Sequence, residues 1–430
     1  MPITLTEEQA SVFELIERTR EHVFVTGKAG TGKSTLLDHL NWNTDKSIVI
    51  CAPTGVAALN VGGQTIHSLF RLPVGVIADA DIDLNDATVK LLNALDAVVI
   101  DEISMVNADL MDAIDRVLRM ARQREEPFGG AQMVMFGDPY QLPPIEPRDP
   151  GEIAYFAEHY PSMWFFDAKV WRDVPMRVVE LSQIHRQSDP RFTSLLNAVR
   201  QGMVTAEMAA HLNEIGARRP VPSSDIITLA TRNDMVRRTN ERQLATLRGA
   251  STTFEAEQMG EWGRTTPADE SLELKVGAQV MFLRNDTFSG SSGPRWVNGS
   301  IGEVTAVKPT VQVRIAGEEV EVEPAEWDRY RYHFDAASKT LARELVASFR
   351  QLPLRLAWAV TIHKSQGASF DRAIVDLGAG AFANGQTYVA LSRLTRIEGL
   401  YLTRPLRPAD VRVDETVREF MRVVLPDATT

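Results

Sequence analysis

The chain has little cysteine and no long apolar run, and each shortage excludes a class of protein. A single cysteine among 430 residues excludes an internal disulfide framework and favours a reducing, cytoplasmic setting. Because Cys51 ends an apolar run, we interpret it as a small buried side chain rather than a nucleophile. No uncharged apolar stretch approaches the roughly 20 residues that span a bilayer. Residues 1–8 carry no basic-then-apolar leader. We therefore expect a soluble protein without a membrane partner.

Positive charge is also in short supply. The sequence has 46 lysines and arginines against 57 acidic residues, a formal net charge of −11. This balance argues against a surface coated for nonspecific nucleic-acid binding, although a basic channel inside an acidic protein stays possible. Because a single core stops growing at about 250–300 residues, we expect two or three domains.

A glycine-rich loop organises the chain. Residues 27–34 fit the pattern G-x-x-x-x-G-K-[ST], and they stand between the apolar run 23–25 and the helix-forming residues 35–40. In such a loop, backbone N–H groups and a helix N-terminus face one anion. Lys33 would add a point charge and Ser34 a hydroxyl ligand for magnesium. The loop predicts a nucleoside triphosphate, in preference to a turn that binds nothing, but does not say how the energy is used.

Two carboxylates and a glutamine follow later strands of the same predicted sheet. Asp101 and Glu102 come directly after the apolar run 97–100, at the edge where α/β folds bind ligands. Asp101 can hold magnesium, and Glu102 can accept a proton from the attacking water or orient it. Gln141, in the loop 137–144, could reach a γ-phosphate, but the local pattern alone fits a rigid connector equally well.

Short strands alternate with helical patterns, which is typical of parallel sheets covered by helices. The strands expected first are 47–52, 97–100 and 133–136, and Asn107 is the expected cap of the helix between the last two. A second series begins at Met176, with strands 177–181, 226–229 and 372–377 and a helix opened by Asp189. Arg186 and Arg393 in this second unit could reach a triphosphate from its far side; the alternative is that they are surface charges.

Residues 272–349 break this rhythm. Strands are expected at 279–283 and 301–307, and a hairpin turns about Ala316 and Gly317, which together indicate a small inserted β-barrel. Residues 354–359 then return to the α/β sheet. The polar loop 361–367 suits a phosphate backbone or a γ-phosphate better than a core.

Nine such stretches, in order, resemble those of superfamily 1B DNA helicases. Within that group the resemblance is to the petite integration frequency (Pif) helicases, with RecD and Dda as more distant relatives. The stretch between the acidic pair and the glutamine loop is the most Pif-like part. The matching stretches are 5–9, 27–34, 52–55 with 65–68, 101–105, 127–132, 137–144, 185–187, 361–367 and 388–393.

The resemblance implies an α/β fold of two tandem RecA-like P-loop domains, with an SH3-like β-barrel inserted in the second. The first domain would span 1–175, with a small wedge at about 68–92. The second would comprise 176–270 and 350–430, and the barrel 271–349.

The resemblance also implies site residues, with ATP and Mg²⁺ as cofactors. The catalytic residues would be Lys33, Glu102, Gln141, Arg186 and Arg393. The metal would be bound by Ser34 and Asp101. ATP would contact Gln9, Gly27, Ala29, Gly30, Thr31, Gly32, Lys33, Ser34, Thr35 and Gly367, with Gln9 on the adenine. DNA would face Pro53, Thr54, His67, Ser68, Phe70, Thr361, His363 and Lys364, with a base stacked on Phe70.

The implied activity is that of an ATP-dependent DNA helicase moving 5′ to 3′ on single-stranded DNA. Its partners would be single-stranded and forked duplex DNA, together with replication or repair proteins, and it would act as a monomer. Two alternatives stay open: the motor subunit of a larger recombination or repair assembly, and a nucleotide-switched DNA-binding module. The chain has no long extension at either end, so targeting functions of larger relatives are not expected.

Overall fold

The computed structural model describes residues 4–187, 189–220, 226–260, 262, 266–286, 295–335 and 340–426. The chain forms two compact units. Unit 1 comprises Met1–His185, Arg329–Val346 and Asp414–Thr430, and unit 2 comprises Arg186–Asp328 and Ala347–Val413. The chain therefore passes from one unit to the other at four points.

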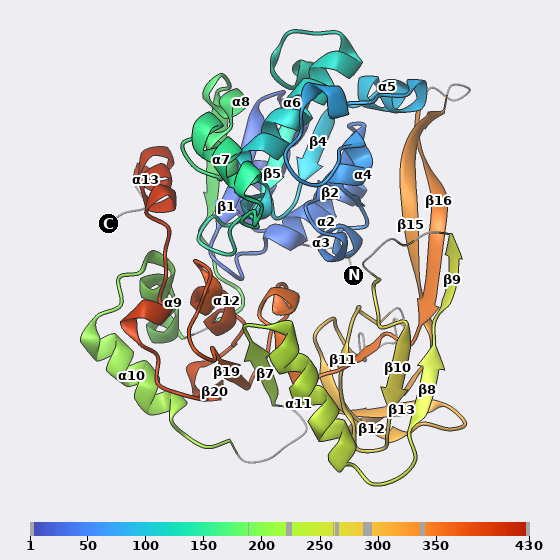
Figure 1. Ribbon diagram of the computed structural model, residues 1–430, viewed down its shortest axis with the longest axis vertical. Helices are drawn as coiled ribbons and strands as arrows, with labels where there is room; N and C mark the ends of the chain where they lie inside the picture. Colours follow the sequence, from blue (N-terminus) through green and yellow to red (C-terminus); the bar gives the residue numbers. More distant parts are fainter. Residues whose placement is uncertain are drawn as a thin grey trace. The chain divides into compact units, whose positions relative to one another are not determined.

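Unit 1 is built on a six-stranded sheet in the order β3-β2-β4-β5-β1-β6, in which every pairing is parallel (Figure 1). The strands are β1 (His22–Gly27), β2 (Ile48–Ala52), β3 (Gln64–Thr65), β4 (Ala97–Ile100), β5 (Gln132–Phe136) and β6 (Met176–Leu181). The expected strands at 47–52, 97–100 and 133–136 are confirmed.

The helices of unit 1 precede, connect or follow these strands. They are α1 (Glu7–Arg18), α2 (Lys33–Asn43), α3 (Gly55–Asn60), α4 (Ile66–Phe70), α5 (Asp86–Asn93), α6 (Ala108–Arg122), α7 (Pro150–His159), α8 (Lys169–Arg172) and the C-terminal α13 (Glu415–Val424). The predicted cap Asn107 is confirmed, because its side chain accepts a hydrogen bond from Leu110 N at 2.8 Å. Thr6 and Gln9 form a reciprocal capping box at the start of α1.

Strand β1, between β5 and β6, shows how alternating side chains divide the core of unit 1. Val23 and Val25 pack in one cluster with apolar residues of α1 and α2, whereas Phe24 contacts Phe165, Trp171 and Phe420 on the other face. Phe420 lies on α13, so the C-terminal helix packs on the first sheet although most of the chain before it belongs to unit 2.

One strand differs from its expected place. Met176–Leu181 is predicted to open the second domain, but β6 pairs along its whole length with β1, from His22 opposite Met176 to Gly27 opposite Leu181. An apolar sequence of this kind fits either the last strand of the first sheet or the first strand of a new domain. Only the pairing with β1 shows that β6 belongs to the first sheet. The first sheet therefore extends past residue 175, and unit 1 runs to His185.

Unit 2 contains a four-stranded parallel sheet in the order β18-β7-β19-β20. Its strands are β7 (Ile227–Ala230), β18 (Ala359–Thr361), β19 (Ala373–Asp376) and β20 (Leu400–Leu402). Its helices are α9 (Pro190–Gln201), α10 (Ala206–Gly216), α11 (Asn233–Thr246) and α12 (Gln386–Leu391). Asp189 caps α9 through Arg191 N, as predicted. The molecule is thus a mixed α/β protein with parallel sheets.

The remaining strands are antiparallel. Five of them, in the order β14-β13-β12-β11-β17, enclose a core that includes Phe282, Trp296 and Val313. A long pair, β15 and β16, forms another sheet with β9, and β10 pairs with β8. The bounds are β8 (Thr252–Glu255), β9 (Glu257–Gly260), β10 (Ser271–Leu274), β11 (Gln279–Phe282), β12 (Ile301–Ala306), β13 (Val311–Ile315), β14 (Glu318–Val322), β15 (Ala325–Asp335), β16 (Thr340–Gln351) and β17 (Leu354–Leu356).

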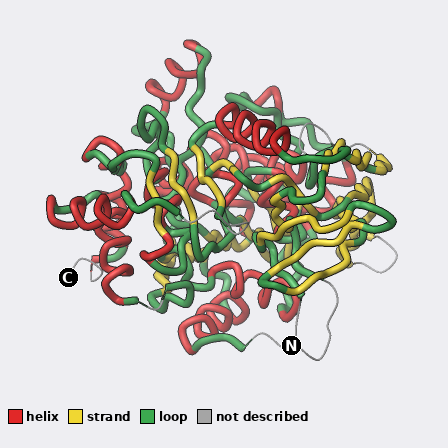
Figure 2. Tube along the Cα trace, turned by 90° about the horizontal axis from the view of Figure 1, so that it is seen from below, coloured by secondary structure: helices red, strands yellow, loops and turns green. Residues whose placement is uncertain are grey.

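The expected return to the α/β sheet at 354–359 is only half right. β17 pairs antiparallel with β11, and the chain rejoins the parallel sheet at Ala359, opposite Thr228. Asn240 fixes this change of sheet: its side chain donates to Leu356 O and Ala359 O and accepts from Ala359 N at 2.9 Å. The strands gather into groups that helices flank (Figure 2).

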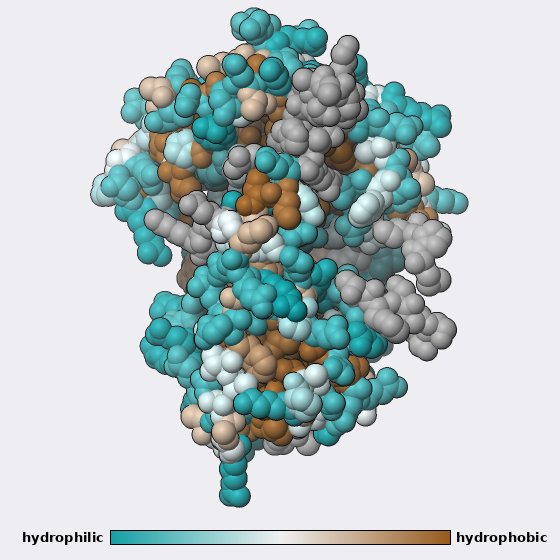
Figure 3. Space-filling model, turned by 90° about the vertical axis from the view of Figure 1, so that its right-hand side faces the viewer, coloured by the Kyte–Doolittle hydropathy of each residue, from teal (hydrophilic) through white to brown (hydrophobic). Residues whose placement is uncertain are grey.

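Hydrophilic side chains cover much of the face drawn in Figure 3, with hydrophobic ones in smaller areas. Among the described residues, no helix combines the length and the apolar character needed to cross a membrane. Cys51 is fully buried, as predicted, and burial raises the pKa of its thiol.

Candidate nucleotide and nucleic-acid site

The phosphate loop has the predicted strand, loop and helix context. It links the end of β1 to the start of α2, and three of its glycines adopt positive φ: Gly27 at 147°, Gly30 at 85° and Gly32 at 80°. The Lys33 ammonium lies across the loop and donates to Gly27 O at 2.6 Å and Lys28 O at 3.1 Å. The loop is thus curled around its own lysine, with the N-terminus of α2 at its end.

Two side chains from outside the loop meet at Gly32. The Gln9 amide donates to Gly32 O at 3.2 Å and accepts from Thr6 N at 3.0 Å. A Cβ added to Gly32 would lie 2.3 Å from Gln9 Nε2 and 3.7 Å from the His185 ring. Gln9 is buried rather than solvated, and in this structure it braces the loop. Its contact with adenine stays a prediction.

The acidic pair stands at the carboxyl end of β4. Asp101 N donates to Cys51 O of the neighbouring strand at 2.9 Å, which fixes the exit from the sheet. Burial, followed by the Glu102 charge, raises the pKa of Asp101 to about 7, and Lys33 opposes this rise. Glu102 itself has a φ of 51°, a conformation that non-glycine residues disfavour and that gathers at functional sites.

The glutamine loop packs directly on the turn that follows the acidic pair. A Cβ on Gly137 would lie 2.8 Å from Ile103 Cγ2 and 3.3 Å from Ser104 N, so only glycine permits this approach. The fully buried Asp138 accepts from Tyr140 N at 3.2 Å and lies 3.5 Å from Gln141 Nε2. Unit 1 therefore brings Lys33, Asp101, Glu102 and Gln141 to one edge of its sheet.

Unit 2 gathers three other predicted residues. Arg186 donates to Ser392 O at 3.1 Å and Gly367 O at 3.3 Å, and burial lowers the pKa of its guanidinium. Arg393 is 2 % exposed and donates to Val389 O and Ser392 Oγ at 3.1 and 2.9 Å. Arg186 and Arg393 thus both contact Ser392, the residue that follows α12, and Arg186 also contacts Gly367.

The predicted DNA-facing residues fall into two loop groups, one in each unit. In unit 1, Thr54 caps α3 through Ala57 N. Ser68 is exposed on α4, and His67 and Pro53 are half-buried. In unit 2, Thr361 ends β18, and its hydroxyl accepts from Lys364 N at 3.3 Å. His363 and Lys364 are exposed on the 3₁₀ turn His363–Ser365.

Phe70 is the exception among these residues. It is fully buried in unit 1, so the predicted stacking of a base on its ring is wrong for this structure. Phe70 lies on the short helix α4, whose other apolar residues Ile66 and Leu69 are also buried. The hydrophobic effect places an aromatic ring in the core unless a surface partner holds it outside. The sequence motif does not show whether the Phe70 ring lies in the core or at the surface.

Two contacts near the site were not predicted. The first is that of Asp138 with Gln141. The place of Asp138 in a loop between two glycine or proline turns is the sequence feature that could have indicated it. Glu8 accepts from Ser182 N at 3.0 Å and from Ser182 Oγ at 2.5 Å. It belongs to the matching stretch 5–9, but nothing in its local pattern indicates a partner 174 residues later.

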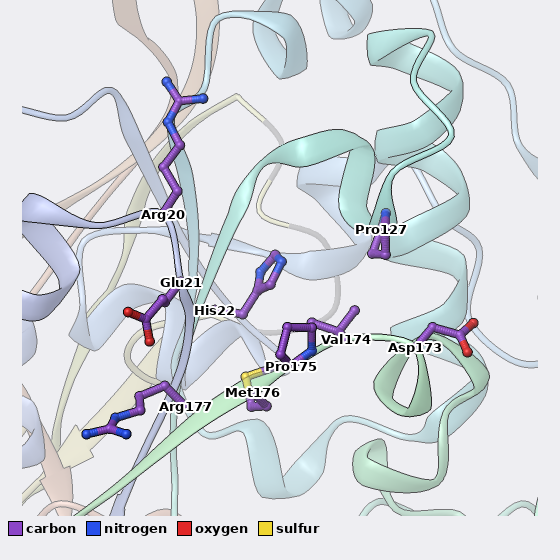
Figure 4. Close-up of a pocket in the computed structure, with 9 residues that line it drawn as sticks. All are labelled: Arg20, Glu21, His22, Pro127, Asp173, Val174, Pro175, Met176 and Arg177. Carbon is purple, nitrogen blue, oxygen red and sulfur yellow. The ribbon is translucent and has the colours of Figure 1, made fainter.

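A separate hollow of about 820 Å³ lies at the opposite edge of the first sheet. It is lined by residues at the amino ends of β1 and β6, among them His22 and Met176, and by Pro127 (Figure 4). His22 Nδ1 accepts from Met133 N at 3.0 Å, so the ring is occupied in holding β5. The phosphate loop, by contrast, stands at the carboxyl end of β1.

Comparison with known proteins identifies the family of this chain. Residues 4–210 match the family model described as PIF1-like helicase. The chain is 37 % identical over 440 residues to the ATP-dependent DNA helicase PIF1 of Mus musculus and spans 63 % of that protein's length. It is 34 % identical over 436 residues to the ATP-dependent DNA helicase Pif1 of Bdellovibrio bacteriovorus, of which it spans 92 %.

Solved structures show the same similarity. The Pif1 of Bacteroides sp in complex with ADP-AlF4 superposes with a TM-score of 0.89 at 36 % identity, and the match covers 98 % of this chain and 97 % of the other. The Bacteroides protein with ADP-AlF3 and single-stranded DNA superposes with a TM-score of 0.71, and the match covers 99 % of this chain and 98 % of the other. Because its relatives match it in sequence and in fold over nearly its whole length, this chain belongs to the PIF1-like helicase family.

Proposed function

We propose that the protein is an ATP-dependent DNA helicase that moves 5′ to 3′ along single-stranded DNA and unwinds duplexes. The observation that carries the proposal is the convergence of Lys33, Asp101, Glu102 and Gln141 at one edge of the first sheet, in a member of the PIF1-like helicase family. Nucleotide-bound and DNA-bound forms of the Bacteroides relative support the same reading. The direction of movement rests on the family resemblance alone.

In this proposal the residues of unit 1 bind and hydrolyse ATP. The loop glycines, Ala29, Thr31 and Thr35 surround the phosphates, Gln9 faces the adenine, and Lys33 turns from its loop carbonyls to the triphosphate. Glu102 orients the attacking water and accepts its proton. Gln141, held by Asp138 and packed on the turn after the acidic pair, senses the γ-phosphate.

The residues present fit Mg²⁺ as a cofactor. The Ser34 hydroxyl and the Asp101 carboxylate are oxygen ligands of the kind this ion takes, together with substrate phosphates. A buried carboxyl whose pKa is raised to about 7 is one that a cation would stabilise in its charged form. Bound there, Mg²⁺ would neutralise charge on the phosphates.

In this proposal unit 2 contributes residues to ATP hydrolysis and to DNA binding. We assign Arg186 and Arg393 to the charge that develops on the γ-phosphate, with Gly367 beside them. Pro53, Thr54, His67, Ser68, Thr361, His363 and Lys364 would contact the DNA, mainly through backbone phosphates. The segment 68–92 would be the wedge at a fork, and the five-stranded antiparallel sheet would be an SH3-like barrel. We expect a cytoplasmic monomer.

A titration of ATP hydrolysis against DNA tests this function. We expect single-stranded DNA to raise the steady-state rate strongly, because hydrolysis in a motor is coupled to its track. Blunt duplex of the same length is the comparison. A rate that ignores single strands, or that blunt duplex raises equally, would leave the nucleotide-switched module. Stimulation without strand separation by the protein alone would favour a motor subunit of a larger assembly.

A further inference from the structure

The segment that leads out of unit 1 is held by two contacts near the phosphate loop. It follows β6 and comprises Ser182, Gln183, Ile184 and His185, and we call it the exit segment. His185 is the last residue of unit 1, and Arg186 is the first residue of unit 2. The exit segment is therefore joined through the backbone to the proposed arginine finger, whose side chain is held by Ser392 O and Gly367 O.

The first contact comes from the phosphate loop itself. His185 N donates to Gly30 O at 2.8 Å, and the His185 ring lies near Gly32. Gly30 and Gly32 are the two loop glycines with left-handed φ of 85° and 80°. Because loop and segment share a backbone hydrogen bond, a change in the curl of the loop moves His185 with it.

The second contact comes from Glu8, one residue before Gln9. Its carboxylate accepts from Ser182 N at 3.0 Å, Ser182 Oγ at 2.5 Å and Gln183 N at 3.5 Å. These are charge-assisted hydrogen bonds, two of them to backbone amides. These bonds are exposed to solvent, so we assign their role to the position of the segment rather than to global stability.

Glu8 and Gln9 are neighbours in the sequence, and each binds a different segment. Gln9 holds Gly32 of the phosphate loop, and Glu8, on the same helical turn, holds the exit segment. The turn is itself rigid, because Thr6 and Gln9 close a capping box at its start. Loop, first turn of α1 and exit segment are therefore tied in a closed ring of hydrogen bonds.

We propose that Glu8 is a positioning residue that couples occupancy of the phosphate loop to the placement of Arg186. When the loop opens to receive phosphate, the ring moves as a unit, and the anchored exit segment carries Arg186 with it. Without Glu8 the segment loses its bonds at Ser182 and Gln183 and keeps the bond from His185 N to Gly30 O. A segment held at fewer points absorbs the motion of the loop and does not pass it on to Arg186. This inference rests on the proposed ATPase function.

The test compares Glu8→Ala with Glu7→Ala in the full chain. Glu7 is exposed, adjacent and in the same first helical turn, so its removal matches the loss of charge near the helix N-terminus. For Glu8→Ala we expect the kcat of DNA-stimulated ATP hydrolysis to fall about tenfold. The KM for ATP should change less than twofold, because Gln9 and the loop are intact. Glu7→Ala should keep both values.

A conservative variant separates contact from charge. Glu8→Gln retains an oxygen that accepts from the Ser182 amide and a group of the same size, so it should recover at least half of the lost rate. The proposal is overturned if Glu8→Ala keeps the parent's kcat, if it raises the KM as much as it lowers the kcat, or if Glu8→Gln does no better than Glu8→Ala.

A readout without DNA keeps this inference separate from the proposed function. Hydrogen exchange in the peptide covering 182–186 should slow or quicken when ADP-AlF4 binds the parent, and Glu8→Ala should lose most of that response. If the parent binds ADP-AlF4 and its rate ignores single-stranded DNA, the function fails while the coupling can still be seen. If exchange in the exit segment is indifferent to ADP-AlF4 in the parent, the coupling fails whatever the rates show.

Discussion

Lys33 and Glu102 lie at the same sheet edge, and we propose that they act on different steps. Lys33→Ala removes the charge that faces phosphate, so nucleotide binding should weaken and hydrolysis should be lost. Glu102→Gln keeps size and hydrogen bonding but cannot accept a proton, so ATP should bind within a few-fold of the parent while turnover falls at least about a hundredfold. Equilibrium binding of a fluorescent ATP analogue and steady-state hydrolysis measure the two effects. Near-normal turnover by Glu102→Gln would remove its assigned role.

At the scale of an element, the 3₁₀ turn Pro408–Asp410 shows how a buried charge holds a loop. The Asp410 carboxylate accepts from both terminal nitrogens of Arg404, at 2.7 and 2.8 Å, and from Arg407 N at 2.8 Å. Asp410→Asn weakens these charge-assisted bonds, and we expect unit 2 to lose about 1.5–3 kcal/mol of unfolding free energy in urea at pH 7.

The same turn predicts a dependence on pH. The hydrogen bonds from Arg404 lower the pKa of Asp410 to about 2, against about 3.9 in an unfolded chain. The lowered pKa means that the stabilisation is complete above about pH 5 and is lost as pH falls from about 4 to 2. The difference in stability between the parent and Asp410→Asn should therefore shrink over that range. A constant difference down to pH 2 would show that the carboxylate charge is not what holds the turn.

At the scale of the whole molecule, the proposed function assigns two arginines of unit 2 to the hydrolysis of ATP. Arg186→Ala and Arg393→Ala should each lower the DNA-stimulated kcat about a thousandfold, because loss of an arginine finger removes charge present only in the transition state. ATP binding should be nearly unchanged. Arg393 is buried, so thermal unfolding of its variant must be checked, and Arg393→Lys keeps the charge as a control. Hydrolysis within a few-fold of the parent would make either arginine a structural residue.

Local physical chemistry determined much of this protein from its sequence. The loop 27–34 needs glycine where φ is positive and a helix immediately after, and both requirements are readable in the chain. Asn107 and Asp189 cap the helices they were expected to cap, since a cap depends on neighbours within three residues. The acidic pair falls at a strand end because the apolar run before it fixes where the strand stops.

Pairing and burial at long range were decided only by the tertiary structure. β6 reads like the first strand of a new domain, but it completes the first sheet beside β1, and β17 joins an antiparallel sheet that its sequence does not distinguish from a parallel one. Phe70 stands in a polar motif, but its ring enters the core. Glu8 finds Ser182 across 174 residues. Each outcome depends on which distant part of the chain packs against the residue or strand in the folded protein, and no local sequence pattern encodes that partner.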